Sequence, residues 1–238
     1  MPGAKGRAIE RVAVIGLGRF GTSVVRTLQE LGYEVTGIDI AKKPIAAVAN
    51  LVALAAQGDG SDEELLRSLN VDRSDVAIVA QGENVEANLL STFVLKGMGV
   101  PWVVARASSA VHGELLRRVG ANRTVFPERD AGVRLAHSLP VRDVTDYISL
   151  SPTAGVAKFP VPAHFVGRRL GELNADRSIP LSVLLIKRGE GLLPSPADAE
   201  VVRAGDVFVV AGTDRDLAGF VEGAAERKER DVAERNGR

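Results

Sequence analysis

The chain has 238 residues, with thirty basic and thirty acidic side chains, so its formal net charge is zero. It contains no cysteine, which excludes a disulfide framework, thiolate metal sites and a cysteine nucleophile. The balanced charge, without a basic cluster, argues against binding to a nucleic acid polymer. No apolar run approaches the roughly 20 residues of a membrane-spanning helix, and the N-terminal stretch lacks the apolar segment of a signal peptide. We therefore expect a cytoplasmic protein of one or two domains.

The first half of the chain alternates short apolar runs with amphipathic segments. The apolar runs predict strands over residues 11–16, 34–39, 52–56, 75–80, 102–106 and 123–126. The amphipathic segments predict helices over residues 22–31, 42–51, 61–69, 84–98 and 110–119. Ser61 and Glu64 have the spacing of a capping box at the start of the third helix. This order is typical of an α/β fold in which helices cover both faces of a parallel sheet.

The pattern changes in the second half. A helix is expected over residues 127–139, between Pro127 and Pro140. Strands then dominate from Tyr147, at 155–161, 181–187 and 207–211, with short helical segments at 167–173 and 214–221. We expect a Rossmann-type lobe over residues 8–126, a crossover helix and linker over 127–146, a smaller α+β lobe over 147–222 and a charged tail over 223–238.

The sharpest motif is Gly16-Leu17-Gly18-Arg19-Phe20-Gly21, which fits the pattern G-x-G-x-x-G. It follows a predicted strand and opens a predicted helix, which is the context of a dinucleotide-binding turn. Gly16 permits the tight turn, Gly18 lets a phosphate approach the backbone, and Gly21 lets the helix pack closely. Asp39 ends the second predicted strand, where its carboxylate can accept hydrogen bonds from ribose hydroxyls and disfavours a 2′-phosphate. The motif predicts an adenine nucleotide without specifying which one.

Two features bear on whether the chain is an enzyme. Arg19 places a guanidinium beside the phosphate turn, which suits a β- or γ-phosphate, although a solvated surface arginine is the alternative. A dehydrogenase would need a proton donor from a second domain. The histidines, His112, His137 and His164, lie in no pattern typical of a catalytic site. Nucleotide binding without catalysis is therefore the better interpretation, and an NAD-dependent oxidoreductase or an NAD(H)-reading redox sensor is the alternative.

Longer stretches carry a family resemblance. Beside the glycine motif stand residues 34–40, 82–101 and 115–136, the last including Gly120-Ala121-Asn122-Arg123 and Pro127-Glu128. Residues 8–222 resemble the RCK proteins, and above all the cytosolic regulatory subunit of Ktr/Trk-type potassium uptake systems. The resemblance implies a Rossmann-type N-terminal lobe, a crossover helix and a smaller C-terminal lobe. It also implies dimers that assemble into an octameric ring on the cytoplasmic face of a potassium-translocating membrane subunit. ATP would favour the active state and ADP the inactive state, and no reaction would be catalysed.

The resemblance also implies the site residues. It assigns nucleotide binding to Gly16, Leu17, Gly18, Arg19, Phe20, Gly21, Asp39, Ile40, Asp59, Gly60, Ala80, Gln81, Gly82 and Arg106. Arg19 would sense the γ-phosphate across a dimer interface, and Asp59 would lie in the loop against the adenine. Arg106 would meet phosphate, unless it forms only a salt bridge at a strand end. Glu83 places an acid near the pocket that many relatives lack, which leaves the ligand preference open.

The remaining implied sites concern a cation, a second ligand and partners. Glu128 matches a family glutamate that brings Mg²⁺ or Ca²⁺ to the γ-phosphates, although its carboxylate could instead stabilise the helix dipole. The C-terminal lobe of some relatives binds cyclic di-AMP, for which Asn174, Arg177 and Pro194 are the candidates here; a lobe without ligand is the alternative. Apolar residues in the helices over 84–98 and 127–139 predict contacts with other subunits, or ordinary core packing.

Overall fold

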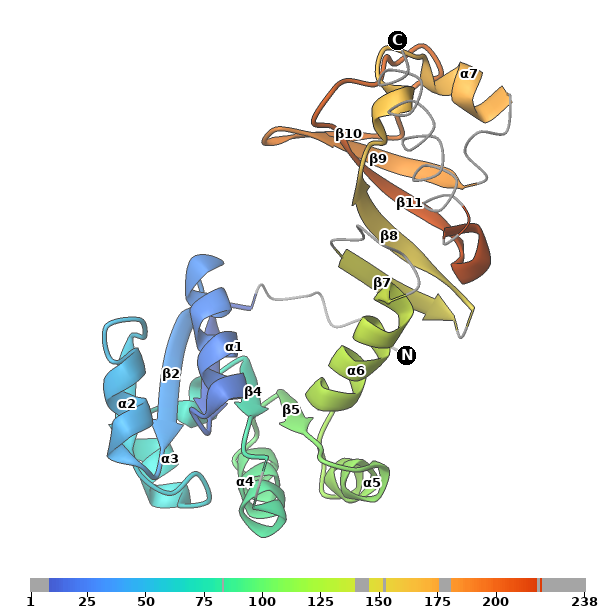
Figure 1. The fold of residues 1–238 in the computed structure, drawn as a ribbon. Helices are drawn as coiled ribbons and strands as arrows, with labels where there is room; N and C mark the ends of the chain where they lie inside the picture. The colour runs from blue at the N-terminus through green and yellow to red at the C-terminus, as the bar shows by residue number, and fades with distance from the viewer. Residues whose placement is uncertain are drawn as a thin grey trace, which may run out of the picture. The chain divides into compact units, whose positions relative to one another are not determined.

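The computed structural model describes residues 9–82, 84–139, 146–151, 153–175, 181–217 and 219. The chain divides into two compact units, which meet in sequence between Pro127 and Glu128. Each unit contains one sheet, of six strands in the first and five in the second (Figure 1). Glu83, Arg177 and the tail from residue 223 were named in the sequence predictions and lie outside the described residues.

The first unit is a parallel α/β sheet, as the alternating pattern predicts. Its strands are β1 Arg11–Ile15, β2 Glu34–Asp39, β3 Leu54–Gln57, β4 Val76–Val79, β5 Trp102–Arg106 and β6 Arg123–Val125. Its helices are α1 Arg19–Glu30, α2 Lys42–Val48, α3 Glu63–Ser68, α4 Val85–Gly97 and α5 Ala110–Arg118, with a short 3-10 helix at Val71–Arg73. All strand pairs in this sheet are parallel, in the order β3-β2-β1-β4-β5-β6.

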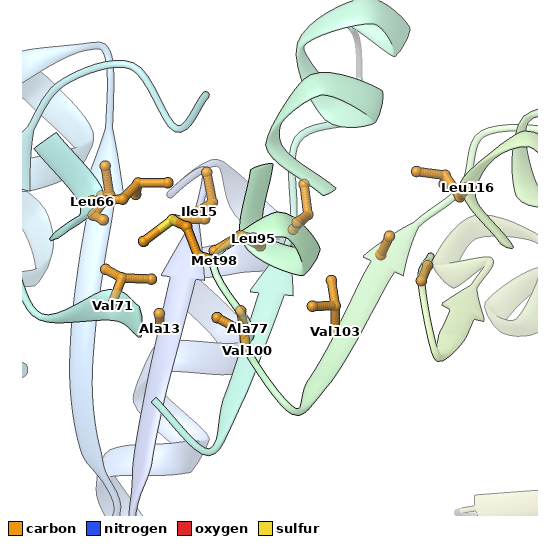
Figure 2. Close-up of a cluster of buried hydrophobic side chains, with 14 of the residues drawn as sticks. Ala13, Ile15, Leu66, Val71, Ala77, Leu95, Met98, Val100, Val103 and Leu116 are labelled. Atoms are coloured by element: carbon orange, nitrogen blue, oxygen red, sulfur yellow. The ribbon is translucent and has the colours of Figure 1, made fainter. Parts of the chain in front are cut away.

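Alternate residues of the strands fill two separate cores, one on each face of the sheet. Ala13 and Ile15 of β1 belong to the core beneath α3, α4 and α5, where Leu95 is fully buried (Figure 2). Val12 and Val14 belong to the core beneath α1 and α2. Burial on both faces explains why the central strands β1 and β4 are nearly continuous apolar runs rather than alternating ones.

Some element boundaries differ from the sequence prediction. The N-cap of α3 is Asp62, whose side chain accepts a hydrogen bond from the Leu65 amide, and not Ser61. Ser61 instead donates from both its amide and its hydroxyl to Asp59. The predicted capping box is therefore wrong, because Ser61 and Asp62 are both good caps and the local turn decides between them. Helix α1 also begins earlier than predicted, directly after Gly18.

The second unit combines α6 with an antiparallel sheet. Its elements are α6 Pro127–Ser138, β7 Asp146–Ser151, β8 Ala154–Pro160, a 3-10 helix Ala163–Phe165, α7 Leu170–Ala175, β9 Ser182–Arg188, β10 Gly191–Pro194 and β11 Val207–Thr213. The strand order is β10-β9-β11-β8-β7, and every pair is antiparallel. The short strand β10 was not predicted. It pairs with β9 through a tight turn at Gly189, whose φ is 57°.

The core of the second unit lies on one face of its sheet. Phe159 and Phe208 meet edge to face with 6.3 Å between ring centroids, and both are buried. At its margin the guanidinium of Arg188 bonds to Asp206 and Glu200 at 2.8 Å each. The hydrogen bond from Arg188 holds the pKa of the buried Asp206 carboxyl below its usual range. The charge of Asp206 is thus compensated where water cannot reach it.

Candidate nucleotide-binding site

The site lies at the carboxyl edge of the parallel sheet, at the point where the order of the strands changes direction. Strand β1 pairs with β2 on one side and with β4 on the other. The connections after β1 and β4 therefore lead away from each other, which is the arrangement at which open α/β sheets bind ligands. Loop residues 16–18 follow β1, and residues 80–82 follow β4. The structure thus brings these two predicted segments to one edge.

The glycine loop adopts the tight turn that its sequence predicts. Gly16 has φ of +91°, a left-handed conformation that favours glycine. A side-chain carbon on Gly21 would overlap the carbonyl oxygen of Gly16, so the helix start could not lie against the loop. A Cβ on Gly18 would meet nothing within 4 Å. That position is open on the protein side, as approach of a phosphate to the backbone requires.

The start of α1 supplies the positive end of a helix to this loop. Gly18 is the N-cap, and the first turn of α1 contains no acidic residue. Arg19 lies exposed in this first turn. The unpaired amides of a helix N-terminus and an adjacent guanidinium both favour an anion. The arrangement suits the phosphates of a nucleotide.

Asp39 fastens the glycine loop to the end of β2. Its Oδ2 accepts from the Leu17 amide at 2.7 Å, and its Oδ1 accepts from the Ala41 amide at 2.8 Å. Each carboxylate oxygen has a further lone pair with which it can accept from a ribose hydroxyl. The neighbouring Ile40 is 69% exposed, so an apolar surface for a base or sugar lies beside this carboxylate.

The floor of the site contains two buried polar side chains, Asn88 and Ser91, which the sequence analysis missed. Asn88 of α4 is fully buried and donates to the carbonyl of Gln81 and to that of Arg106, the latter at 2.9 Å. It therefore joins the end of β4 to the end of β5. Ser91 donates to the side chain of Gln81 at 3.2 Å. The buried face of α4 also contains Ser91 and Thr92, so its polar character gave no apolar pattern from which Asn88 could have been singled out.

Arg106 lies across the ends of β4 and β5. Its guanidinium carbon is 5.9 Å from the centroid of the Phe20 ring, within the range of a cation–π contact. The guanidinium also lies against Gly82, where a Cβ would overlap it. Residues from the glycine loop, β4 and β5 therefore meet at this one side chain.

The loop after β3 forms a tight turn of its own. Asp59 accepts from the Ser61 amide at 2.8 Å and from the Ser61 hydroxyl at 2.7 Å, which lowers the pKa of the Asp59 carboxyl. Gly60 is buried, and a Cβ there would overlap Ile15 of β1. The turn is thus fixed against the sheet near the carboxyl end of β1.

The other predicted residues belong to the second unit. Glu128 is exposed in the first turn of α6. Asn174 is exposed on α7 and Pro194 is exposed on β10. No group of three or more histidine, aspartate or glutamate side chains with metal-binding geometry occurs within the residues that the structure describes. A cation at Glu128 would therefore need further ligands from phosphate, from water or from another chain.

Both units match models of known domains. Residues 12–127 match the TrkA-N domain and residues 156–222 match the TrkA-C domain. The order of these domains defines the class: a Rossmann-type lobe followed by a small antiparallel lobe.

The chain is similar to potassium uptake proteins over most of its length. It is 35% identical to the Ktr system potassium uptake protein C of Bacillus subtilis over 208 residues, covering 87% of this chain and 94% of that protein. It is 31% identical to the Ktr system potassium uptake protein A of Vibrio alginolyticus, covering 88% of this chain and 95% of that protein. The chain therefore belongs to the family of RCK-type Ktr/Trk potassium uptake proteins, which confirms the resemblance seen in its motifs.

Solved structures support the fold. The GsuK RCK domain matches with a TM-score of 0.58 at 21% identity, covering 90% of this chain, which spans about half (47%) of that solved chain. A structure described as the GsuK channel bound to NAD matches with a TM-score of 0.57. In the described part of our chain, no helix has both the length and the apolar character needed to cross a membrane.

Proposed function

We propose that this chain is a nucleotide-sensing regulatory subunit that gates a K⁺-translocating membrane protein. The observation that carries the proposal is the preformed phosphate turn at the switch between β1 and β4, with Asp39 already fastened to it. ATP would favour the conducting state and ADP the non-conducting state. The chain would act in the cytoplasm, at the inner face of the membrane, through its partner. The family relatives named as potassium uptake proteins support this role.

Regulation by exchange of ATP for ADP needs a side chain that distinguishes the two nucleotides. Arg19, exposed beside the positive end of α1, is the proposed group for the γ-phosphate. The test is binding of ATP, ADP, NAD⁺ and NADH to the purified protein by calorimetry. We expect Arg19→Ala to weaken ATP binding about tenfold or more, since a charge-assisted hydrogen bond contributes about 1.5–3 kcal/mol. NAD⁺ binding should change far less.

Arg26→Ala is the matched control, because Arg26 lies exposed further along the same helix. It should leave both affinities unchanged. An equal loss of ATP and NAD⁺ affinity in Arg19→Ala would contradict the γ-phosphate assignment. Binding of NADH alone would favour a redox sensor in place of the gating subunit.

The oxidoreductase alternative requires a general acid at the nicotinamide. In the nucleotide lobe the candidate is His112, which is 4% exposed. Its Nδ1 faces the amide and hydroxyl of Ser108, at 3.3 and 3.1 Å, and its Nε2 is buried. A ring enclosed in this way cannot reach a substrate without rearrangement, which favours sensing over catalysis.

Assembly is the next part of the proposal. Phe93 and Leu90 of α4 are 63% and 46% exposed, and Leu135 of α6 is 62% exposed. Exposed large apolar side chains on two helices favour contacts with further copies of the chain, in dimers and an octameric ring. Light scattering tests this: replacing Phe93 with glutamate should reduce the assembly size, whereas Ala87→Glu, on the same helix, should have a smaller effect.

The cation and second-ligand proposals are tested together by thermal stability. A ligand that binds the native state raises the unfolding midpoint. If Glu128 brings Mg²⁺ or Ca²⁺ to ATP, the cation should increase the shift given by ATP in the wild type and not in Glu128→Gln.

If Asn174, Arg177 and Pro194 border a cyclic di-AMP site, this ligand should raise the midpoint without nucleotide. No shift would contradict that site.

A further inference from the structure

The nucleotide site contains a glycine whose role concerns a side chain and not the ligand. A Cβ built on Gly82 would overlap Nη1 and Cζ of Arg106 and come to 2.8 Å from Nη2. The backbone of Gly82 does not have a positive φ, so its conformation alone does not require glycine. Glycine suits this position because the guanidinium of Arg106 occupies the space that a side chain would fill.

An aromatic ring also lies close to the guanidinium. Phe20 lies in the first turn of α1, and its ring centroid is 5.9 Å from the guanidinium carbon. An Arg over an aromatic face gains cation–π attraction and loses side-chain freedom. Asn88 fixes the backbone at the base of the same arginine by donating to its carbonyl at 2.9 Å. The guanidinium therefore lies against Gly82 and the ring of Phe20, and the backbone of Arg106 is fixed by Asn88, at the edge where the phosphate turn lies.

We propose that Gly82 is a positioning residue: its missing side chain, together with the ring of Phe20, places the guanidinium of Arg106 for contact with a nucleotide phosphate. This inference rests on the proposed nucleotide function. Positioning matters here because a long flexible arginine must otherwise be ordered when the ligand binds, which lowers affinity. Gly82→Ala should displace the guanidinium while keeping its charge in the protein. The displaced atoms are the far end of a flexible side chain, so the fold should remain intact.

The experiment compares ADP with adenosine, which lacks phosphate, by calorimetry. Gly82→Ala and Arg106→Ala should each weaken ADP about tenfold, the loss expected for one charge-assisted contact, and change adenosine binding less than about twofold. The double variant should bind ADP no more weakly than Arg106→Ala alone, because Gly82 acts through Arg106. Phe20→Leu should give a smaller loss of ADP affinity, of about twofold to fivefold. Gly97→Ala is the matched control, since a Cβ there meets nothing within 4 Å.

A second readout does not depend on nucleotide. Phenylglyoxal modifies accessible arginine, and mass spectrometry measures the rate at Arg106. The rate should rise in Gly82→Ala and stay at the wild-type value in Gly97→Ala. An unchanged rate, ADP affinity equal to that of the wild type, or additive losses in the double variant would each overturn the proposal. If the rate rises but the wild type binds no nucleotide, the positioning of Arg106 stands and the proposed function fails.

Discussion

At the scale of single residues, Asp39 has an observed structural role and a predicted binding role. Its two oxygens accept from the amides of Leu17 and Ala41, so the carboxylate defines the shape of the glycine loop before a ligand arrives. The same carboxylate is the predicted ribose acceptor. A change at Asp39 should therefore affect stability and binding together, unlike a change at a residue that touches only the ligand.

Asp39→Asn removes one acceptor while keeping the size of the side chain. We expect a loss of about 1–3 kcal/mol in the free energy of unfolding, because one backbone amide loses its partner, and weaker binding of all ribonucleotides. Urea denaturation and calorimetry measure the two effects. Asp62→Asn is the control, since it removes the same charge while asparagine remains a good N-cap of α3. Its stability should change by less than about 0.5 kcal/mol. Equal losses in both variants would contradict the role of Asp39.

His112 predicts a dependence of stability on pH. Burial lowers the pKa of its imidazole below the ordinary value of about 6.5. His112 therefore binds a proton more readily in the unfolded chain than in the folded chain. Its contribution to stability is then fully present above about pH 6.5 and is lost as the pH falls through the folded pKa. The urea midpoint should fall between pH 7 and pH 5, and less so in His112→Asn. The same fall in both proteins would show that other groups are responsible.

The glycines and Asp39 could be predicted from the sequence because the motif fixes their spacing along one turn. Phe20 and Arg106 were named as site residues, but their contact with each other was not predicted. They are far apart in the chain, and only the pairing of β5 beside β4 brings them together. Asn88 was missed for the same reason. Its partners are carbonyls at the ends of two other strands, and such a network has no local pattern.

At the scale of elements, a partly buried polar cluster joins α6 to the sheet of the second unit. Nδ1 of His137 lies 3.0 Å from Asp214, and the His137 and Tyr147 rings stack with 5.2 Å between centroids. Tyr147 of β7 donates its hydroxyl to the same Asp214. Burial and the neighbouring carboxylate raise the pKa of the Tyr147 phenol. Gly155 of β8 leaves the space that this phenol occupies.

Tyr147→Phe tests this cluster. The variant keeps the ring and removes one donor to Asp214, so we expect a loss of about 1–2 kcal/mol in the stability of the second unit. Hydrogen exchange in β7 and β8 should report it. Tyr33→Phe is the control, because this partly buried tyrosine packs against a core of the first unit. Unchanged exchange in Tyr147→Phe would mean that the Tyr147–Asp214 hydrogen bond does not contribute to holding α6 in place.

The strands and helices of the first unit were largely predictable, because burial on both faces makes the central strands nearly continuous apolar runs and helical segments separate the strands. The second unit was harder. Strand β10 has four residues, and three of them are more than a third exposed, so neither alternation nor a long apolar run marks it. The sequence feature that marks β10 is the turn at Gly189. This turn predicts a following strand only if the preceding strand, β9, has been identified.

At the scale of the whole molecule, the apolar cores remain within their own units. Leu95 of α4 and Leu173 of α7 are both fully buried, one in each unit. Leu95→Ala and Leu173→Ala should each cost about 2–5 kcal/mol. By hydrogen exchange, the first change should loosen only the first unit and the second only the second unit. Nucleotide should protect the first unit in both variants. Loosening of both units by either change would show that they unfold together.

The glycine loop also has a kinetic consequence. The Gly16 amide donates to Ile38 at 2.8 Å, the Leu17 amide donates to Asp39, and the Ala80 amide donates to Ile15 at 2.7 Å, so this edge is rigid before binding. Because the turn is already formed, a nucleotide can bind without a preceding step in which the loop becomes ordered. Association can then approach the rate of diffusional encounter. If the chain binds ATP and ADP as proposed, we expect their affinities to differ mainly in the rate of dissociation. The proposed sensor would then respond to a change in the ratio of ATP to ADP within the residence time of the nucleotide that dissociates more slowly.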